Sequence, residues 1–266
     1  MHQIDLPTNG HSPSPSPMLP KLSFDEYQTH AEEPIVPYEM DRRQLIPMAT
    51  SSALQVDICR FLVYQLQCHF ATHPHRMVAV TGVGIRTEED SCRIPSITVC
   101  SQALWLKIRQ RSGAAILEAG EVPTLVIEVS SGDGRDAYIR KRAEYALVGI
   151  VEYWIIDPVK GRIRILTNPQ NDDGYEHQDF TNGQTVQFVQ FPELFLGVDQ
   201  ILAPSNIEDL IQMDQTRLQK LEEQIEQERQ RADRMAAMLR DNWLRYYIKG
   251  KPVSIRREPG EHYPPL

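Results

Sequence analysis

The sequence predicts an α/β fold of the α+β kind: a mixed sheet flanked by helices, followed by a long C-terminal helix or coiled coil. Between Ser52 and Phe70, apolar residues recur at the three- and four-residue spacing of a helix. The run Leu125–Val129 is apolar on both faces apart from one glutamate, which is typical of a central strand covered on both sides. The stretch 207–244 contains neither Gly nor Pro and is rich in Glu, Gln and Arg, which favours one long helix.

The elements follow in order along the chain. Alternating Ser and Pro make residues 1–21 an arm that we expect to be disordered, and residues 22–204 form the predicted folded domain. In it, Gly149 is expected to end a helix as its left-handed cap. A strand and turn are predicted over 37–49. Further strands are predicted over 77–87, 93–101, 123–131, 152–158 and 162–168, and helices over 23–30, 53–70, 102–112 and 137–149. The stretch 180–198 is predicted to hold a last strand and a turn at Asn182-Gly183.

The C-terminal region is predicted to be a charged helix over 205–245 followed by a flexible basic tail over 246–266. Polar breaks near Asp214 and Glu228 interrupt its apolar stripe. A coiled coil with a second copy or a neighbour is one interpretation, and a solvated single helix or local helical pair is the other. The apolar residues of the stripe are Leu210, Leu218, Leu221, Ile225, Ala232, Met235 and Leu239.

Composition excludes several classes of protein. The net charge of −8 gives no overall attraction for DNA or an anionic membrane, so any nucleic-acid contact must come from a local basic patch. No stretch is long and apolar enough for a membrane helix, and the N-terminus lacks the pattern of an export signal. The four cysteines lack paired spacing and are expected to be small buried hydrophobes, and the histidines near residue 70 to be on the surface. We therefore expect a soluble, cytoplasmic protein.

Glu128 is the most informative residue, because a carboxylate in a buried strand must be paired, hydrogen-bonded or bound to a metal. Two interpretations remain open from the residues alone: a functional carboxylate, or a structural ion pair with the cluster Arg140–Arg142. Lys141 on the following helix could bring its ammonium to the same cleft. A carboxylate-bound divalent cation beside a lysine suits the attack of water on a phosphodiester.

The segment 122–158 resembles the restriction endonuclease family of the Uma type, a branch of the PD-(D/E)XK nuclease superfamily. The matching residues, in order, are Glu128-Val129, Ser131, Asp136, Lys141, Tyr145, Glu152-Tyr153-Trp154 and Asp157-Pro158. The segment with Tyr38-Glu39 resembles the N-terminal part of the family, and the stretch RIPSITVCSQALW resembles the strand with its first catalytic acid. The resemblance covers about residues 22–204.

This resemblance implies a restriction-endonuclease-like fold and an Mg2+ (or Mn2+) site. Glu128 would be a metal ligand, Lys141 the catalytic lysine on the helix, and Glu39 an auxiliary acid. Ser96 stands where the family has its first metal-binding aspartate, and a hydroxyl is a weak ligand for Mg2+. Acids of the preceding loop, Glu88, Glu89 and Asp90, are candidates to replace that aspartate. Arg42-Arg43 stands where the family has a glycine turn.

Two functions are therefore weighed. The first is metal-dependent hydrolysis of DNA phosphodiester bonds, weakened or lost through Ser96. The second is a catalytically inactive module of the same fold that binds nucleic acid or protein and assembles through its C-terminal helix. For DNA we expect weak, salt-sensitive contact with a local patch. We also expect a homo-oligomer, formed through the domain or the C-terminal helix. The predicted patch consists of Arg109, Arg111, Arg140 and Arg142.

Overall fold

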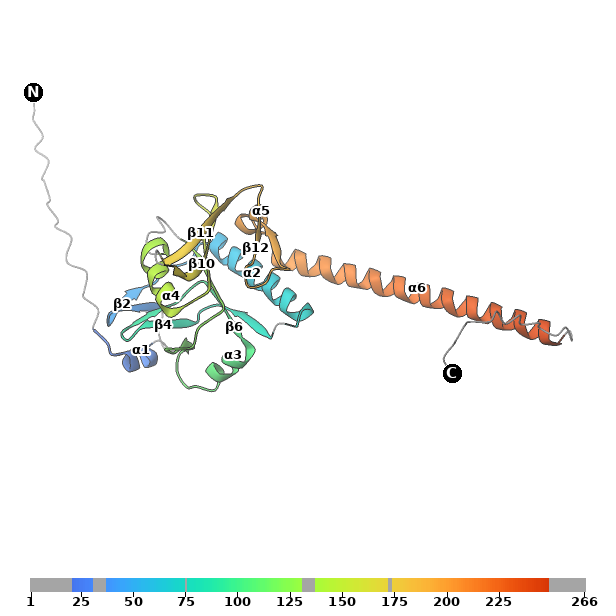
Figure 1. Ribbon diagram of the computed structural model, residues 1–266, viewed down its shortest axis with the longest axis horizontal. Helices are drawn as coiled ribbons and strands as arrows, with labels where there is room; N and C mark the ends of the chain where they lie inside the picture. Colours follow the sequence, from blue (N-terminus) through green and yellow to red (C-terminus); the bar gives the residue numbers. More distant parts are fainter. Residues whose placement is uncertain (1–20, 31–36, 75, 131–136, 172–173, 249–266) are drawn as a thin grey trace, which may run out of the picture. The chain divides into compact units, whose positions relative to one another are not determined.

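The computed structural model describes residues 21–30, 37–74, 76–130, 137–171 and 174–248. The chain divides into two compact units, Met1–Ile207 and Glu208–Leu266. The first unit contains the sheets and the second contains the long helix α6 (Figure 1). The predicted α/β class with a long C-terminal helix is confirmed, and each unit is described by itself below.

A six-stranded sheet forms the centre of the first unit, in the order β11-β10-β9-β8-β6-β3. β8 and β9 are parallel and every other pair is antiparallel, so the sheet is mixed as predicted. All five residues of β8 are buried, which confirms the central strand predicted from its apolar run. The strands are β3 (Met77–Val80), β6 (Ile97–Ser101), β8 (Leu125–Val129), β9 (Glu152–Asp157), β10 (Arg162–Asn171) and β11 (Gly174–Thr181).

A second mixed sheet of five strands has the order β2-β1-β5-β4-β7, with β4 and β7 parallel. The turn between β1 and β2 places Arg42 and Arg43 in the left-handed region, with φ of 49° and 70°. This conformation favours glycine, so the two arginines form the tight turn where the resembled family has a glycine. The strands are β1 (Tyr38–Asp41), β2 (Gln44–Pro47), β4 (Gly84–Glu88), β5 (Ser91–Arg93) and β7 (Ile116–Leu117), and a separate pair joins β12 (Thr185–Gln187) to β13 (Phe195–Gly197).

Three predicted strands are divided in the structure. The stretch 93–101 covers the end of β5 and all of β6, which belong to different sheets, and 180–198 covers the end of β11 together with β12 and β13. The stretch 77–87 divides into β3 and β4, which belong to different sheets. Gly82, with φ of 69°, lies in the bend between them. Gly84 also needs its lack of a side chain, because a Cβ there would lie 2.9 Å from Cys92 Sγ. The two glycines thus allow the chain to leave one sheet and enter the other.

The helices begin and end largely where the sequence predicts. α2 starts with a capping box in which the Ser52 hydroxyl accepts from Gln55 N–H and the Gln55 side chain accepts from Ser52 N–H. α4 ends at Gly149, whose φ of 85° confirms the predicted left-handed cap. The helix leading into it starts as a π turn, η1 (Ala137–Lys141). The helices of the first unit are α1 (Phe24–His30), α2 (Ala53–Thr72), α3 (Gln102–Arg109), α4 (Arg142–Val148) and α5 (Val198–Leu202).

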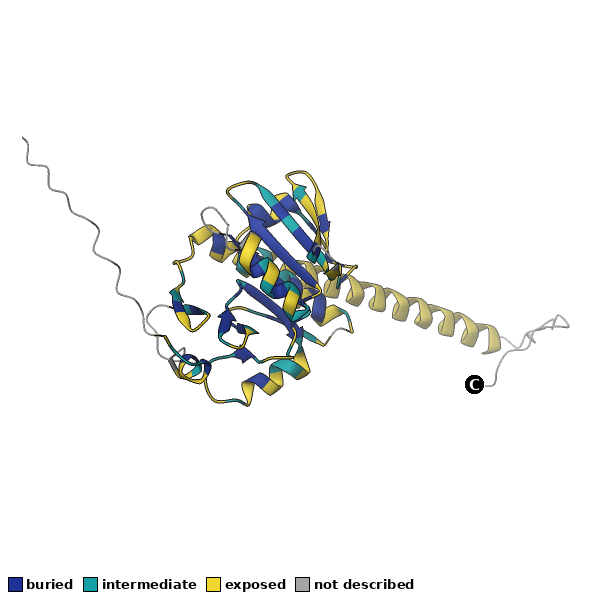
Figure 2. Cartoon of the chain, turned by 60° about the vertical axis from the view of Figure 1, so that its left-hand side comes forward, coloured by how far each residue is buried: buried dark blue, intermediate teal, exposed yellow. Residues whose placement is uncertain are grey.

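The core lies between the central sheet and the helices, as the dark blue strands of Figure 2 show. Tyr153 and Trp154 are fully buried, which confirms their interpretation as packing residues. The expectations for single residues are met in part. Cys92 and Cys100 are buried, whereas Cys68 is exposed, so the prediction of buried cysteines is wrong for Cys68. His69 is buried against aromatic rings, which corrects its prediction as a surface residue.

The second unit contains α6 (Ile207–Ile248), one uninterrupted helix. Every residue from Ile211 to Ile248 is exposed, and the helix is yellow along its length in Figure 2. Among the described residues, no helix is long and apolar enough to cross a membrane.

Candidate active site

The two sheets and α2 enclose a cleft of about 870 Å3. Glu128, near the end of the central strand β8, lines it together with Glu39 from β1, Ser96 just before β6, and Lys141 at the end of the π turn η1. The four residues predicted to act at a metal site therefore meet in one cleft. They come from four segments that are far apart in the sequence.

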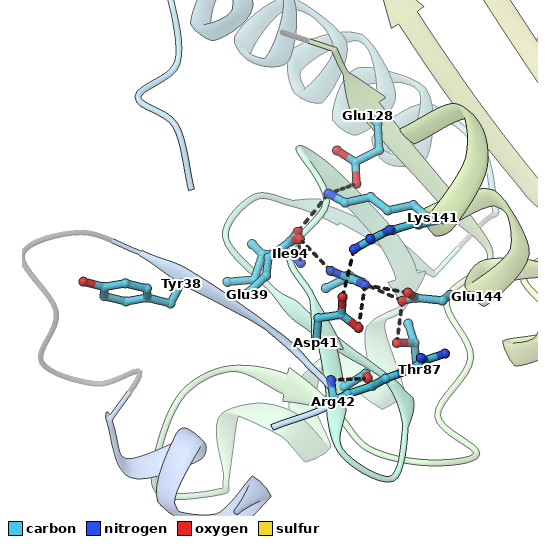
Figure 3. Close-up of polar contacts among 12 residues, drawn as sticks. Tyr38, Glu39, Asp41, Arg42, Thr87, Ile94, Glu128, Lys141 and Glu144 are labelled. Atoms are coloured by element: carbon cyan, nitrogen blue, oxygen red, sulfur yellow. Dashed lines mark hydrogen bonds and ion pairs between the residues drawn. The ribbon is translucent and has the colours of Figure 1, made fainter. Parts of the chain in front are cut away.

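Lys141 joins the two glutamates (Figure 3). Its Nζ lies 2.8 Å from Glu39 Oε1 and 2.8 Å from Glu128 Oε1. All three side chains are less than 10% exposed. The Tyr145 hydroxyl donates a second hydrogen bond to Glu128 Oε1, at 3.1 Å. Among the residues that the structure describes, both hydrogen bonds to Glu128 end on Oε1.

The charges of this group are coupled. Burial raises the pKa of Glu128, and the nearby Glu39 carboxylate raises it further, while Lys141 partly offsets both effects. Burial by itself would lower the pKa of Lys141, but attraction to Glu128 and Glu39 outweighs that cost and raises this pKa. Lys141 is therefore held protonated, and its ammonium can donate hydrogen bonds but cannot accept a proton.

Arg93 organises the rest of the cluster from β5. Its guanidinium makes a two-pronged contact with Glu144, Nε to Oε2 at 2.7 Å and Nη2 to Oε1 at 2.5 Å. It also lies 3.4 Å from both Glu39 Oε2 and Asp41 Oδ1. The Thr87 hydroxyl donates to Glu144 at 2.8 Å. Burial alone would raise the pKa of Glu144, but the hydrogen bonds from Arg93 lower it below its ordinary value. Arg93 is only 1% exposed, so it anchors Glu39 from the protein interior.

The backbone also holds Glu39 in place. Ile94 N–H donates to Glu39 Oε1 at 2.9 Å. β1 pairs with β5 where Met40 faces Cys92, and this pairing brings Glu39 beside Arg93 and Ile94. Oε1 of Glu39 thus faces both the backbone and Lys141, and Oε2 faces Arg93.

Ser96 lies next to the end of β8. Its hydroxyl accepts a hydrogen bond from Val129 N–H at 3.0 Å, directly after Glu128. Burial, with the charge of Glu128, raises the pKa of the Cys59 thiol of α2 to about 11. The Gln55 side chain donates to Val129 O at 3.1 Å. Ser96 therefore lines the same cleft as Glu128 and presents a neutral oxygen beside the end of β8.

The loop acids considered as substitutes for the missing aspartate do not line the cleft. Glu88, Glu89 and Asp90 form the end of β4 and its turn into β5. Their position contradicts the idea that they replace it.

The four arginines of the predicted nucleic-acid patch are dispersed. Arg140 lines the cleft and pairs with Asp41 at 3.0 Å. The others do not line it. Arg111 is paired with Glu121, and Arg142 donates to Tyr175 O at 2.9 Å. Arg109 is exposed at the end of α3.

Sequence reasoning found the residues that project from the central strand and its following helix, but it missed Arg93, Asp41 and Tyr145 as parts of the site. β5 is only three residues long and shows no periodic pattern. Two buried acids facing one lysine leave one negative charge unbalanced. That imbalance predicts a further buried cation and is the signal that could have pointed to Arg93. Ser131 and Asp136, which contribute to the resemblance, lie outside the described residues.

The fold is that of a nuclease-like α/β protein. It is similar to the crystal structure of a "putative nuclease belonging to DUF820" from Anabaena variabilis, with a TM-score of 0.53 and 19% identity, over 68% of this chain and 98% of that chain. The model of the Uma2 family, described as "Putative restriction endonuclease", matches residues 24–199. The chain belongs to this family, which confirms the resemblance seen in its sequence. No curated protein matches it.

Proposed function

We propose that the cleft hydrolyses phosphodiester bonds with a divalent cation held between Glu128 and Glu39, and that Ser96 makes this activity weak. The observation that carries the proposal is that the Lys141 ammonium lies 2.8 Å from one carboxylate oxygen of Glu39 and 2.8 Å from one of Glu128, in a cleft that all three side chains line. Burying two carboxylates and one ammonium costs free energy of desolvation, and such clusters of buried charges are common at functional sites. Membership of the Uma2 family supports the reaction type.

The residues fit Mg2+ or Mn2+, with a small donor set. Mg2+ is commonly held by one or two carboxylates together with substrate phosphates. Glu128 Oε2 and the Glu39 carboxylate supply two such donors. Among the described residues, no group of three or more His, Cys, Asp or Glu is arranged to hold a metal. A cation bound here would supply the positive charge that polarises a phosphate group and acidifies a water molecule.

Ser96 determines how strong that site is. An aspartate at this position could keep the hydrogen bond from Val129 N–H through one oxygen and offer the other to the cleft. The serine uses its hydroxyl for that bond and adds no charge. We therefore infer that the cation binds weakly until a substrate phosphate completes its coordination.

Lys141 has two roles in this proposal. Its held proton lets it stabilise negative charge that develops on the phosphate, so it acts as an electrostatic group and not as a general base. Without a divalent cation, it pairs with both carboxylates, and Arg93 supplies a second positive charge beside Glu39. Lys141 therefore competes with the divalent cation for Glu39 and Glu128, and binding of the cation requires it to turn toward the substrate.

DNA is the substrate that family membership favours, and Arg140 at the edge of the cleft is the first candidate for a phosphate contact. With a net charge of −8 and Arg111 and Arg142 engaged within the protein, we expect weak binding that falls steeply with salt. Arg109 is left as an exposed candidate outside the cleft.

The test is cleavage of supercoiled plasmid with Mg2+ or Mn2+, comparing the natural protein with Ser96→Asp and with the double variant Ser96→Asp/Glu128→Gln. We expect slow cleavage by the natural protein, faster cleavage by Ser96→Asp, and none by the double variant. Cleavage that is indifferent to Glu128 would contradict the proposal.

The alternative function is a non-catalytic module that binds nucleic acid or protein. The observation favouring it is that Lys141 and Arg93 together pair with Glu39 and Glu128, which lets the cluster stand without a metal. Binding of Mn2+ separates the two, because the nuclease needs it and the module does not.

A further inference from the structure

The helix α6 exposes an unusual amount of apolar surface. A charged helix that remained single in water would keep a polar surface, yet large apolar side chains occur along its whole length. Those with at least 39% of their surface exposed are Ile211, Met213, Leu218, Leu221, Ile225, Met235, Met238, Leu239, Trp243, Leu244, Tyr246, Tyr247 and Ile248.

Most of these residues belong to one seam. Steps of four and three residues from Ile207 run without interruption to Tyr246, which is the heptad spacing of a coiled coil. The a positions are all apolar: Ile211, Leu218, Ile225, Ala232, Leu239 and Tyr246. The d positions alternate between apolar and polar: Ile207, Asp214, Leu221, Glu228, Met235 and Asn242.

The polar d positions form a pattern of their own. Asp214, Glu228 and Asn242 are each followed three residues later by an arginine at the g position, which flanks the seam. In the middle case the two side chains are paired, with Arg231 Nη1 3.6 Å from Glu228 Oε1. The arginines are Arg217, Arg231 and Arg245. Each of the two acidic layers, Asp214 and Glu228, therefore has an arginine three residues later on the same chain.

Ion pairs within Leu218–Ile248 contribute little to the stability of this long helix in water. A solitary charged helix relies on many pairs at spacings of three and four residues. Within the fully described stretch Leu218–Ile248, one ion pair joins side chains of the helix, Arg231 with Glu228, beside a hydrogen bond from Gln230 to Glu226. Packing of the seam against a partner would add to the stability of the helix.

We propose that α6 is the interface between two copies of this chain, paired as a parallel, in-register, two-stranded coiled coil. At Leu221 and Ile225 the seam has Leu at d and Ile at a, which is the combination that favours two strands. In a parallel, in-register pair, each a or d residue faces the same residue of the second chain. Apolar residues therefore meet apolar residues, and polar residues meet polar residues. Arg217 at g then faces Glu222 at e of the second copy, which is an attractive pair. In an antiparallel pairing, the carboxylates of Asp214 and Glu228 would instead face aliphatic side chains.

The first test is the mass of the full-length protein by sedimentation equilibrium, with two matched variants. Leu239→Glu places a charge in the seam, and Leu244→Glu makes the same change on the opposite face, at position f. We expect the natural protein and Leu244→Glu to have twice the mass of one 30.5 kDa chain. For Leu239→Glu we expect dimer affinity to fall at least about tenfold, because two carboxylates share an apolar layer. Circular dichroism checks that both variants keep their helix.

Two results would overturn the interface. The natural protein could sediment as a single chain at tens of micromolar, or both variants could remain fully dimeric, in which case any dimer forms elsewhere. The orientation is tested by Arg217→Glu and Glu222→Arg. Each alone should weaken the dimer about threefold to tenfold, and an equimolar mixture should restore it, because opposite charges then face each other across the two chains. A mixture no tighter than either variant alone would contradict the parallel pairing.

Discussion

Glu128 and Glu152 are both buried glutamates of the same signature segment, and they lie on neighbouring parallel strands. β8 and β9 pair with Leu125 opposite Glu152 and Glu128 opposite Ile155, so the two acids lie at opposite ends of the pair. Burial raises the pKa of both carboxyls. Their partners differ, however, and the partners indicate which acid is available for chemistry.

Glu152 accepts hydrogen bonds from neutral donors: Trp154 Nε1 at 2.7 Å, Val189 N at 3.0 Å and Gln190 N at 2.8 Å. Both of its oxygens are used, it is 0% exposed, and it does not line the cleft. It fastens the segment around residue 189 to the sheet. Glu128 instead faces the Lys141 ammonium, and its hydrogen bonds from the described residues all end on Oε1. A buried acid in a signature segment can therefore be structural or functional, and its partners distinguish the two.

The largest expected effect is on cleavage. In a Ser96→Asp background, Glu128→Gln should reduce plasmid cleavage to background, because it removes the charge that would hold the cation. Glu152→Gln in the same background should retain cleavage per folded molecule. The comparison uses cleavage rates divided by the folded fraction, which circular dichroism measures. If both variants lost the same share of the cleavage rate, the functional distinction between the two acids would be wrong.

The next largest effect is expected from Lys141→Met. Loss of the ammonium leaves two buried carboxylates without their shared cation, so the free energy of unfolding should fall by about 3–5 kcal/mol in urea denaturation. Mn2+ should then stabilise this variant more than it stabilises the natural protein, since the competing ammonium is gone.

The control for that experiment is Lys160→Met. Lys160 pairs with Asp157 at 3.0 Å but its side chain is 47% exposed, so its loss should cost little. If Mn2+ raised the stability of the natural protein and Lys141→Met equally, the cation would not be binding at Glu39 and Glu128.

A smaller effect is expected from Glu152→Ala, which leaves two backbone N–H groups and an indole N–H without their acceptor. The free energy of unfolding should fall by about 3 kcal/mol, with no change in Mn2+ affinity. Urea denaturation and a metal titration measure the two quantities. Stability within about 0.5 kcal/mol of the natural protein would show that the structural role assigned to Glu152 is wrong.

The smallest expected effect is on stability and concerns Glu121, which lies outside β8 and β9. The hydrogen bond from Arg111 lowers the pKa of Glu121 to about 2 from an ordinary 4.5. The folded-state pKa is depressed, so this carboxylate stabilises the fold above pH 4.5 and that contribution is lost as pH falls toward 2. Glu121→Gln should therefore be less stable than the natural protein at neutral pH, by less than about 1 kcal/mol. The difference should vanish near pH 2, and a constant difference across this range would contradict the assignment.

The sequence was sufficient to predict features with a local cause. The central strand with Glu128, the helix with Lys141 and its cap at Gly149 follow from apolar pattern and turn chemistry, and the structure places them as expected. The contact of Glu39 with Lys141 depends instead on the pairing of β1 with β5, which joins segments about fifty residues apart. The division of 77–87 between two sheets depends on Gly82 adopting a positive φ, which one glycine in a strand pattern does not reveal.

Binding of Mn2+ tests the central claim most directly, that Glu128 and Glu39 form a cation site weakened at Ser96. Electron paramagnetic resonance of free Mn2+ can be titrated with the natural protein, Ser96→Asp and Glu128→Gln, each checked for folding. Affinity should be highest in Ser96→Asp, lower in the natural protein and lowest in Glu128→Gln, because each step removes one carboxylate from the site. Equal affinity in all three proteins would contradict the account.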